Sequence, residues 1–262
     1  MVRLLRIYFA MQAAHLRAQL QYEADVWLAL IGVALGQIVG ALFISSLFRL
    51  RPALGGWSIW EAAVPYGLIG LARGLSELLC EGLWHIRTIV ARGELDVPLV
   101  RPLPLVFQIA TRASDLHSLS NLIIGSSIIG LAFHRLGLVL SAAKIIFFVF
   151  TMAGSTLVMA AMILIANSIA FWDRSVDSSL PSFVLQIADG AQIPLSVYGA
   201  PVRVVLTWIL PYAFVSYFPA QVLLGKPVTP LAWASPLIGP LVAGLACMIF
   251  RLGLRRYESA GH

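Results

Sequence analysis

The stretch VWLALIGVALGQIVGALFISSLF (Val26–Phe48) runs from end to end without one ionisable side chain. A second stretch of the same kind occupies Ile145–Phe171. About 20 helical residues are needed to cross the ~30 Å hydrocarbon core of a bilayer. Each stretch is long enough and apolar enough to do so. Both therefore predict membrane-spanning helices, and the chain is expected to be a polytopic membrane protein.

The rest of the sequence shares this apolar character. Hydrophobic residues make up 60% of the chain and charged residues 11%, whereas about a quarter of the residues in soluble domains are charged. Long apolar runs without a two-residue alternation favour helices over barrel strands. We predict an all-α membrane protein with a single transmembrane domain over residues 1–262. Six spans are expected: Val26–Phe48, Ile59–Cys80, Leu116–Phe133, Ile145–Phe171, Val204–Leu224 and Leu231–Phe250.

The basic residues predict the orientation of the chain. Arg3, Arg6 and Arg17 fall on one helical face, with leucines opposite, so residues 1–25 form either an amphipathic helix in the membrane interface or a plain positive flank. With the N-terminus inside, twelve Lys/Arg lie in the inner segments and five in the outer ones. This asymmetry predicts that both termini are cytoplasmic. It also accounts for the high isoelectric point without nucleic acid as a partner.

The two longest connections, 81–115 and 172–203, are expected on the inner side, so a large partner would be met there. The first contains ARGELDVPLVRPLP (Ala91–Pro104), in which three prolines prevent one continuous helix. Such a segment suits docking of a partner, because a rigid segment loses little entropy on binding. It could also be a connector that only turns the chain. The candidate docking residues are Arg87, Arg92, Gly93, Glu94, Asp96 and Arg101.

Two features inside the predicted spans stand out. Gly32, Gly36 and Gly40 share one face of the first span, which favours close helix packing or a dimer seam. Arg73 and Glu77 lie one turn apart in the second span. Charged groups at membrane depth usually face protein or water, but a pair within one helix, reaching towards the interface, is also possible.

The segment LPYAFVSYFPA (Leu210–Ala220) carries two prolines among aromatic residues. It predicts a broken or re-entrant helix, or in part an aromatic belt at the membrane surface. Trp208 and Tyr212 are, with Arg73 and Glu77, our candidates for a substrate route.

Patterns of catalytic residues and cofactor-binding motifs are poorly represented. The five histidines are scattered without metal-ligand spacing, and no phosphate-binding loop is present. We predict no catalytic residue, no metal site and no cofactor bound by this chain. If ATP drives the protein, another chain binds it.

One family resemblance emerges from these motifs. RGELDVPLVRPL (Arg92–Leu103) resembles the G-x-L-D-x-x-L-x-R-P signature of bacterial ABC transporter permeases of the type-2 exporter fold. The basic N-terminus, GGWSIWE (Gly55–Glu61) and the long stretch Ile193–Gly225 match in the same order, so the resemblance covers essentially the whole chain. It implies six spans, an N-terminal elbow helix and a multi-pass location in the bacterial inner membrane, with both termini cytoplasmic.

The resemblance also implies a function. Such permeases work as pairs, identical or related, on two separate ATPase subunits that bind ATP and Mg. The loop 81–115 would carry the coupling helix, and 172–203 would make a second contact with the ATPase. Membrane lipids would surround the pair. Two alternatives remain: a membrane enzyme acting on lipids through the polar pairs Arg73/Glu77 and His117/Asn121, or a scaffold subunit that recruits a partner without transport.

Overall fold

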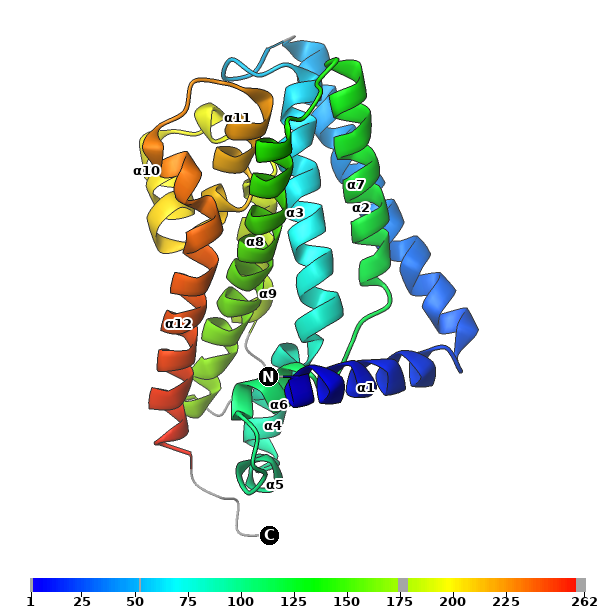
Figure 1. The fold of residues 1–262 in the computed structure, drawn as a ribbon, viewed down its shortest axis with the longest axis vertical. Helices are drawn as coiled ribbons and strands as arrows, with labels where there is room; N and C mark the ends of the chain where they lie inside the picture. The colour runs from blue at the N-terminus through cyan, green and yellow to red at the C-terminus, as the bar shows by residue number, and fades with distance from the viewer. Residues whose placement is uncertain (1, 52, 174–178, 258–262) are drawn as a thin grey trace.

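Five long helices run side by side along the long axis of the molecule, and a sixth lies across one of their ends (Figure 1). This computed structural model describes residues 2–51, 53–173 and 179–257, in which the only β-type pairing is one bridge between Leu54 and Trp57. We call the end crossed by α1 the α1 end, and the opposite end the far end. The long helices are α2 (Glu23–Leu50), α3 (Ile59–Cys80), α7 (Ser118–Arg135), α8 (Ala142–Ser168) and α12 (Ser235–Leu254).

Local sequence sets where these helices begin. The Ser58 hydroxyl accepts from the Glu61 backbone N–H, and the Glu61 carboxylate accepts from the Ser58 N–H, which forms a capping box at the start of α3. Ser141 caps α8 in the same way through the Lys144 N–H. Within the described residues, α2, α8 and α12 are long and apolar enough to cross a membrane. A bent pair could add a fourth span, and six spans remain a prediction.

The bent pair lies where a broken helix was predicted. Residues Ala200–Ile209 and Tyr212–Leu224 form two helical pieces that meet at 79°, which confirms the break at Pro211. Arg203 and Gln221, near their outer ends, line the same small hollow. The outer ends of the two pieces therefore lie near each other, and the predicted fifth span Val204–Leu224 is a sharply bent pair rather than one continuous helix.

Residues 172–203 also differ from expectation, because they do not form a loop at one end. Helix α9 (Leu180–Gly190) packs along α8, and the chain then continues to the far end. There the Ser196 hydroxyl donates to the Gly55 carbonyl at 2.8 Å. Helix α9 escaped notice because it is shorter than a span and carries Asp189. Residues 174–178 of this segment, including Arg174, lie outside the described residues.

Glycines bring two pairs of helices into close contact. A Cβ on Gly239 of α12 would lie 2.1 Å from the Gly154 carbonyl oxygen of α8. A Cβ on Gly67 of α3 would lie 2.8 Å from the Gly125 carbonyl oxygen of α7. Both contacts are with backbone, so the absence of a side chain is what allows these crossings.

Helix α1 (Val2–Gln19) is attached by polar contacts to the residues beneath it. The Tyr8 hydroxyl and the Gln12 amide both donate to the Leu79 carbonyl, each at 3.1 Å. The Gln19 side chain donates to the Ser114 carbonyl and accepts from the Leu116 N–H. Its orientation across the bundle fits an elbow helix, and its position in a membrane interface stays a prediction (Figure 1).

Candidate functional site: a polar cavity and a docking segment

A cavity of about 500 Å³ lies between α2, α3, α7 and α9, in the half of the bundle nearer α1. Its size falls within the ~300–1,000 Å³ of typical ligand pockets. Most of the side chains that line it are polar. They are Gln37, Arg73, Glu77, Asp115, Asn121, Asp189 and Gln192.

An ion pair connects α3 with α9 on one side of this cavity. The Arg73 guanidinium lies 2.5 Å from the Asp189 carboxylate and also donates to the Leu185 carbonyl at 3.2 Å. The Gln192 amide donates to the same carboxylate at 3.0 Å. The structure thus pairs Arg73 with another helix rather than with Glu77 in its own helix, and charged groups inside a helix bundle are usually satisfied in this way.

A hydrogen-bond chain crosses the other side of the cavity. The Asn121 amide of α7 donates to the Glu77 carboxylate at 2.9 Å. The Asn121 side-chain oxygen accepts from the Gln37 amide of α2, also at 2.9 Å. Three helices are therefore joined through neutral amides, and among the described residues the Glu77 side chain accepts its one hydrogen bond from an amide.

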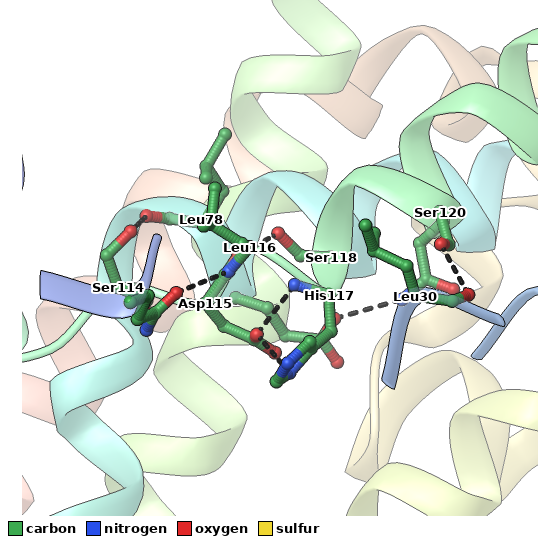
Figure 2. Close-up of polar contacts among 11 residues, drawn as sticks. Leu30, Leu78, Ser114, Asp115, Leu116, His117, Ser118 and Ser120 are labelled. Carbon is green, nitrogen blue, oxygen red and sulfur yellow. Dashed lines mark hydrogen bonds and ion pairs between the residues drawn. The ribbon is translucent and has the colours of Figure 1, made fainter. Parts of the chain in front are cut away.

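Figure 2 shows the polar contacts at the junction that begins α7, and Asp115 of this junction belongs to the cavity lining. The Ser114 hydroxyl donates to the Leu78 carbonyl at 3.2 Å, and the Ser120 hydroxyl donates to the Leu30 carbonyl at 2.8 Å. These two bonds tie the start of α7 to α3 and α2. The Asp115 carboxylate accepts from the His117 backbone N–H and lies 2.7 Å from the His117 ring nitrogen Nδ1.

Glu81 lies just beyond α3, in the 3₁₀ turn η1 (Glu81–His85). Burial, together with the nearby carboxylates of Asp115 and Glu77, raises the pKa of its carboxyl group to about 8. The carboxyl end of α3 therefore holds an acid that favours its protonated form at neutral pH.

The glycine ridge of α2 faces this cavity in part. Gly36 and Gly40 belong to its lining, and a Cβ on Gly40 would lie 2.9 Å from the Tyr66 hydroxyl. Gly32 and Gly36 have open space where a Cβ would be. The role of the ridge as a dimer seam stays a prediction.

Trp208 and Tyr212 are not in the cavity lining. Tyr212 is fully buried, and its hydroxyl donates to the Val184 carbonyl at 3.1 Å. Trp208 is exposed, and its ring lies edge-on to the Phe214 ring. The structure therefore brings Arg73 and Glu77 together at one cavity, with the two aromatic candidates elsewhere.

The second feature is a compact segment at the α1 end, which we call the docking segment (residues 86–101). It contains α4 (Ile86–Ala91) and α5 (Asp96–Leu99), and Gly93 between them has φ = 70°, a left-handed conformation that suits the end of a helix. Leu95 is fully buried beneath the turn. The Gln108 amide, from α6 (Leu105–Ala110), donates to the Pro98 and Leu103 carbonyls at 2.9 Å each. The segment is thus held rigidly from beneath.

Most of the predicted docking residues lie on the surface of this segment. Arg92, Asp96 and Arg101 are exposed. Glu94 is bound by Arg112 at 2.7 Å, and Asp96 accepts from the Tyr257 hydroxyl at 3.1 Å. Arg87, in contrast, is buried, so in this conformation it supports the segment from within.

Sequence reasoning missed the apolar part of the docking segment. Val97, Leu99 and Val100 are exposed around α5. In a chain so rich in aliphatic residues, nothing marks these three as special until their surroundings are known. Asp189 and Gln37 were missed for a related reason, since each meets its partners only through the fold.

An all-helical bundle with apolar spans, an internal polar cavity and a rigid segment at one end is the arrangement of a polytopic membrane transport component. The family described as ABC-2 family transporter protein matches residues 34–261. The chain therefore belongs to this family and is a membrane component of an ABC transporter. No curated protein matches the chain.

Proposed function

We propose that this chain is the permease subunit of an ATP-driven exporter and that it couples to separate ATPase subunits through the docking segment. The observation that carries this proposal is the exposed apolar surface of α5. Val97, Leu99 and Val100 are 59%, 46% and 84% exposed, although Leu95 beside them is fully buried. Exposed aliphatic side chains on a rigid turn suit insertion into a groove of a partner, because little freedom is lost on binding.

The packing of the docking segment supports its role in coupling. Ile86, Ile89 and Leu95 share one buried cluster with Leu164 of α8 and Phe250 of α12. A displacement of the docking segment would therefore be transmitted to α8 and α12 through this shared apolar cluster. ATP and Mg bound to the partner ATPase would shift the permease between two conformations. They can do so only if the ATPase binds them with different affinities in the two states.

A pair of permeases, identical or related, would complete the transport unit within the bacterial inner membrane. Helix α2 supports this proposal because only 6% of the residues in its most apolar stretch are buried within one chain, which leaves most of its surface available to a second permease. The orientation with both termini cytoplasmic is supported by the arginines. With Arg203 at the far end, eleven Lys/Arg remain in the inner segments and six in the outer ones.

The test is to purify the full chain gently from its native membrane and quantify the ATPase that accompanies it. Val100→Asp, at the exposed tip of the docking segment, should reduce the ATPase recovered by at least about tenfold, because an unpaired carboxylate buried in an apolar interface costs several kcal/mol. Val139→Asp is the matched control, since Val139 is 93% exposed in the loop after α7, at the far end. Equal ATPase recovery with both variants would contradict docking through this segment.

The two alternatives make different predictions. The polar residues that a membrane enzyme would use are engaged between helices, Arg73 with Asp189 and Asn121 with Glu77, which favours positioning over catalysis. A scaffold subunit would recruit the ATPase without a response to solutes. ATPase activity that requires this chain and rises with an added solute would therefore separate an exporter from a scaffold.

A further inference from the structure

An apolar groove lies next to the polar cavity. This groove has a volume of about 370 Å³, lies between α2, α3 and α7, and is lined by aliphatic residues such as Ala63, Ile124 and Ile128. Tyr66 lines both hollows, and its hydroxyl donates to the Gln37 carbonyl. The two hollows, one polar and one apolar, therefore adjoin at Tyr66 beside α2, and a shift of this one side chain would join them into an elongated site.

The polar half carries an excess of acidic groups. Glu77, Asp115 and Asp189 face a single guanidinium, that of Arg73, which is already paired with Asp189. His117 lies against Asp115, outside the cavity lining. Glu77 has a neutral amide, Asn121, as its hydrogen-bond donor. The carboxylate of Glu77 is thus the group that a bound cation would compensate best.

The order of the two halves matches the way an amphiphile lies in a membrane leaflet. The acidic cavity is nearer the α1 end, because it includes residues at the start of α7 and the end of α3. The groove is nearer the far end, because it includes Ile59, Trp60 and Leu131. A molecule entering from the leaflet beside α1 would keep its head at that end, and its tail would extend past the bilayer centre towards the far end. Gly36 and Gly40 leave α2 without side chains above the cavity, which shortens the path from the lipid side.

We propose that this composite site binds a cationic amphiphile, with an ammonium or similar head beside Glu77 and an aliphatic or aromatic tail in the groove beyond Tyr66. Only one part of this proposal rests on the proposed function, namely that the bound ligand is the transported substrate. Binding itself depends on the cavity and the groove alone, and each is large enough for part of a ligand.

The experiment is equilibrium binding to the purified full chain in nanodiscs of zwitterionic lipid, with empty nanodiscs subtracted. The probe is dodecyltrimethylammonium below its micelle concentration, compared with neutral dodecyl maltoside and anionic dodecyl sulfate. We expect saturable binding of the cationic probe and only non-saturable partitioning of the other two. Glu77→Gln keeps the hydrogen bond with Asn121 and should weaken cation binding by at least about tenfold, because a buried charge partner is lost.

Two further variants define the site. Glu94→Gln removes a carboxylate from the docking segment, outside the cavity, and should leave binding unchanged. Ala63→Phe fills the groove and should weaken binding of the twelve-carbon probe more than that of its six-carbon homologue. If Ala63→Phe weakened binding of the twelve-carbon probe no more than that of the six-carbon probe, the tail would not lie in this groove.

Three outcomes would overturn the proposal. Equal uptake of all three head groups would show partitioning into lipid only. Unchanged binding by Glu77→Gln would remove the acidic cavity from the site. Loss of binding in chemically cross-linked permease pairs would show that a second copy covers this face. A chain that binds the cation but never retains an ATPase would refute the exporter function and leave this site intact.

Discussion

Replacing Gly239 by alanine tests the close contact between α8 and α12 with the smallest possible change. The added Cβ would lie 2.1 Å from the Gly154 carbonyl oxygen and 2.6 Å from the Gly154 Cα, whereas ordinary contacts begin at 3.4 Å. Both neighbours are backbone atoms, so α8 and α12 must move apart by roughly 1 Å. A gap of that size loses a quarter to a half of each dispersion contact along the interface.

The expected cost follows from this separation. Overpacking of a close interface destabilises a protein by about 1–3 kcal/mol. A loss of 1 kcal/mol lowers the melting temperature of a chain of this size by about 2–4 °C. Gly239→Ala should therefore melt about 2–12 °C below the wild type. The assay is thermal unfolding in detergent with a thiol-reactive fluorophore, which reports exposure of the partly buried Cys80 and Cys247.

Gly244 provides the matched control within the same helix. A Cβ on Gly244 would meet nothing within 4 Å. Gly244→Ala should leave the melting temperature unchanged or raise it slightly, because alanine is favoured over glycine in a helix by up to about 1 kcal/mol. Equal melting temperatures for the two variants would refute the argument that backbone contact at Gly239 holds α12 against α8.

Two other predictions concern the α1 end and the glycine ridge. The pKa of Glu81 is raised to about 8 in the folded chain from an ordinary value of 4.5, so the folded state binds more protons and its stability should fall as pH rises between these values. Glu81→Gln should flatten this decline in melting temperature, and a decline as steep as that of the wild type would show that another group causes it. Gly36→Leu should reduce cross-linking between permeases if the ridge forms the dimer seam. Unchanged cross-linking, combined with weaker binding of dodecyltrimethylammonium, would assign the ridge to the cavity of a single chain instead.

The sequence predicted the long helices well because each is encoded locally. The predicted span Val26–Phe48 lies within α2, and Ile145–Phe171 lies within α8 and the 3₁₀ turn that follows it. An uninterrupted apolar run of this length is rarely compatible with any structure other than a membrane-spanning helix. Pro211 marked the break in the bent pair, and Gly93 marked the end of a helix, because backbone chemistry at these residues limits the local conformation.

The polar cavity could not be predicted in the same way. Arg73 and Glu77 were visible as charges in a span, but their partners Asp189 and Asn121 come from other parts of the chain. The short helix α9 lacks the length of a span, so the sequence predicts a loop where α9 leads the chain to the far end. The close glycine contacts also depend on the facing helix, and neither Gly154 nor Gly239 stood out beside the regular ridge of α2.

The ion pair between Arg73 and Asp189 also sets an order for membrane insertion. Helix α9 spans eleven residues, well short of the ~20 that cross the hydrocarbon core, and it carries an acid near its end. A charged residue at the centre of a helix adds about 2.5–3.5 kcal/mol to the cost of insertion, and one near the end adds less, so the short length and the charge together disfavour insertion of α9 by itself. Its counter-charge arrives much earlier in synthesis, on α3. We therefore expect α9 to pack against α3 only after the first half of the chain has inserted into the membrane.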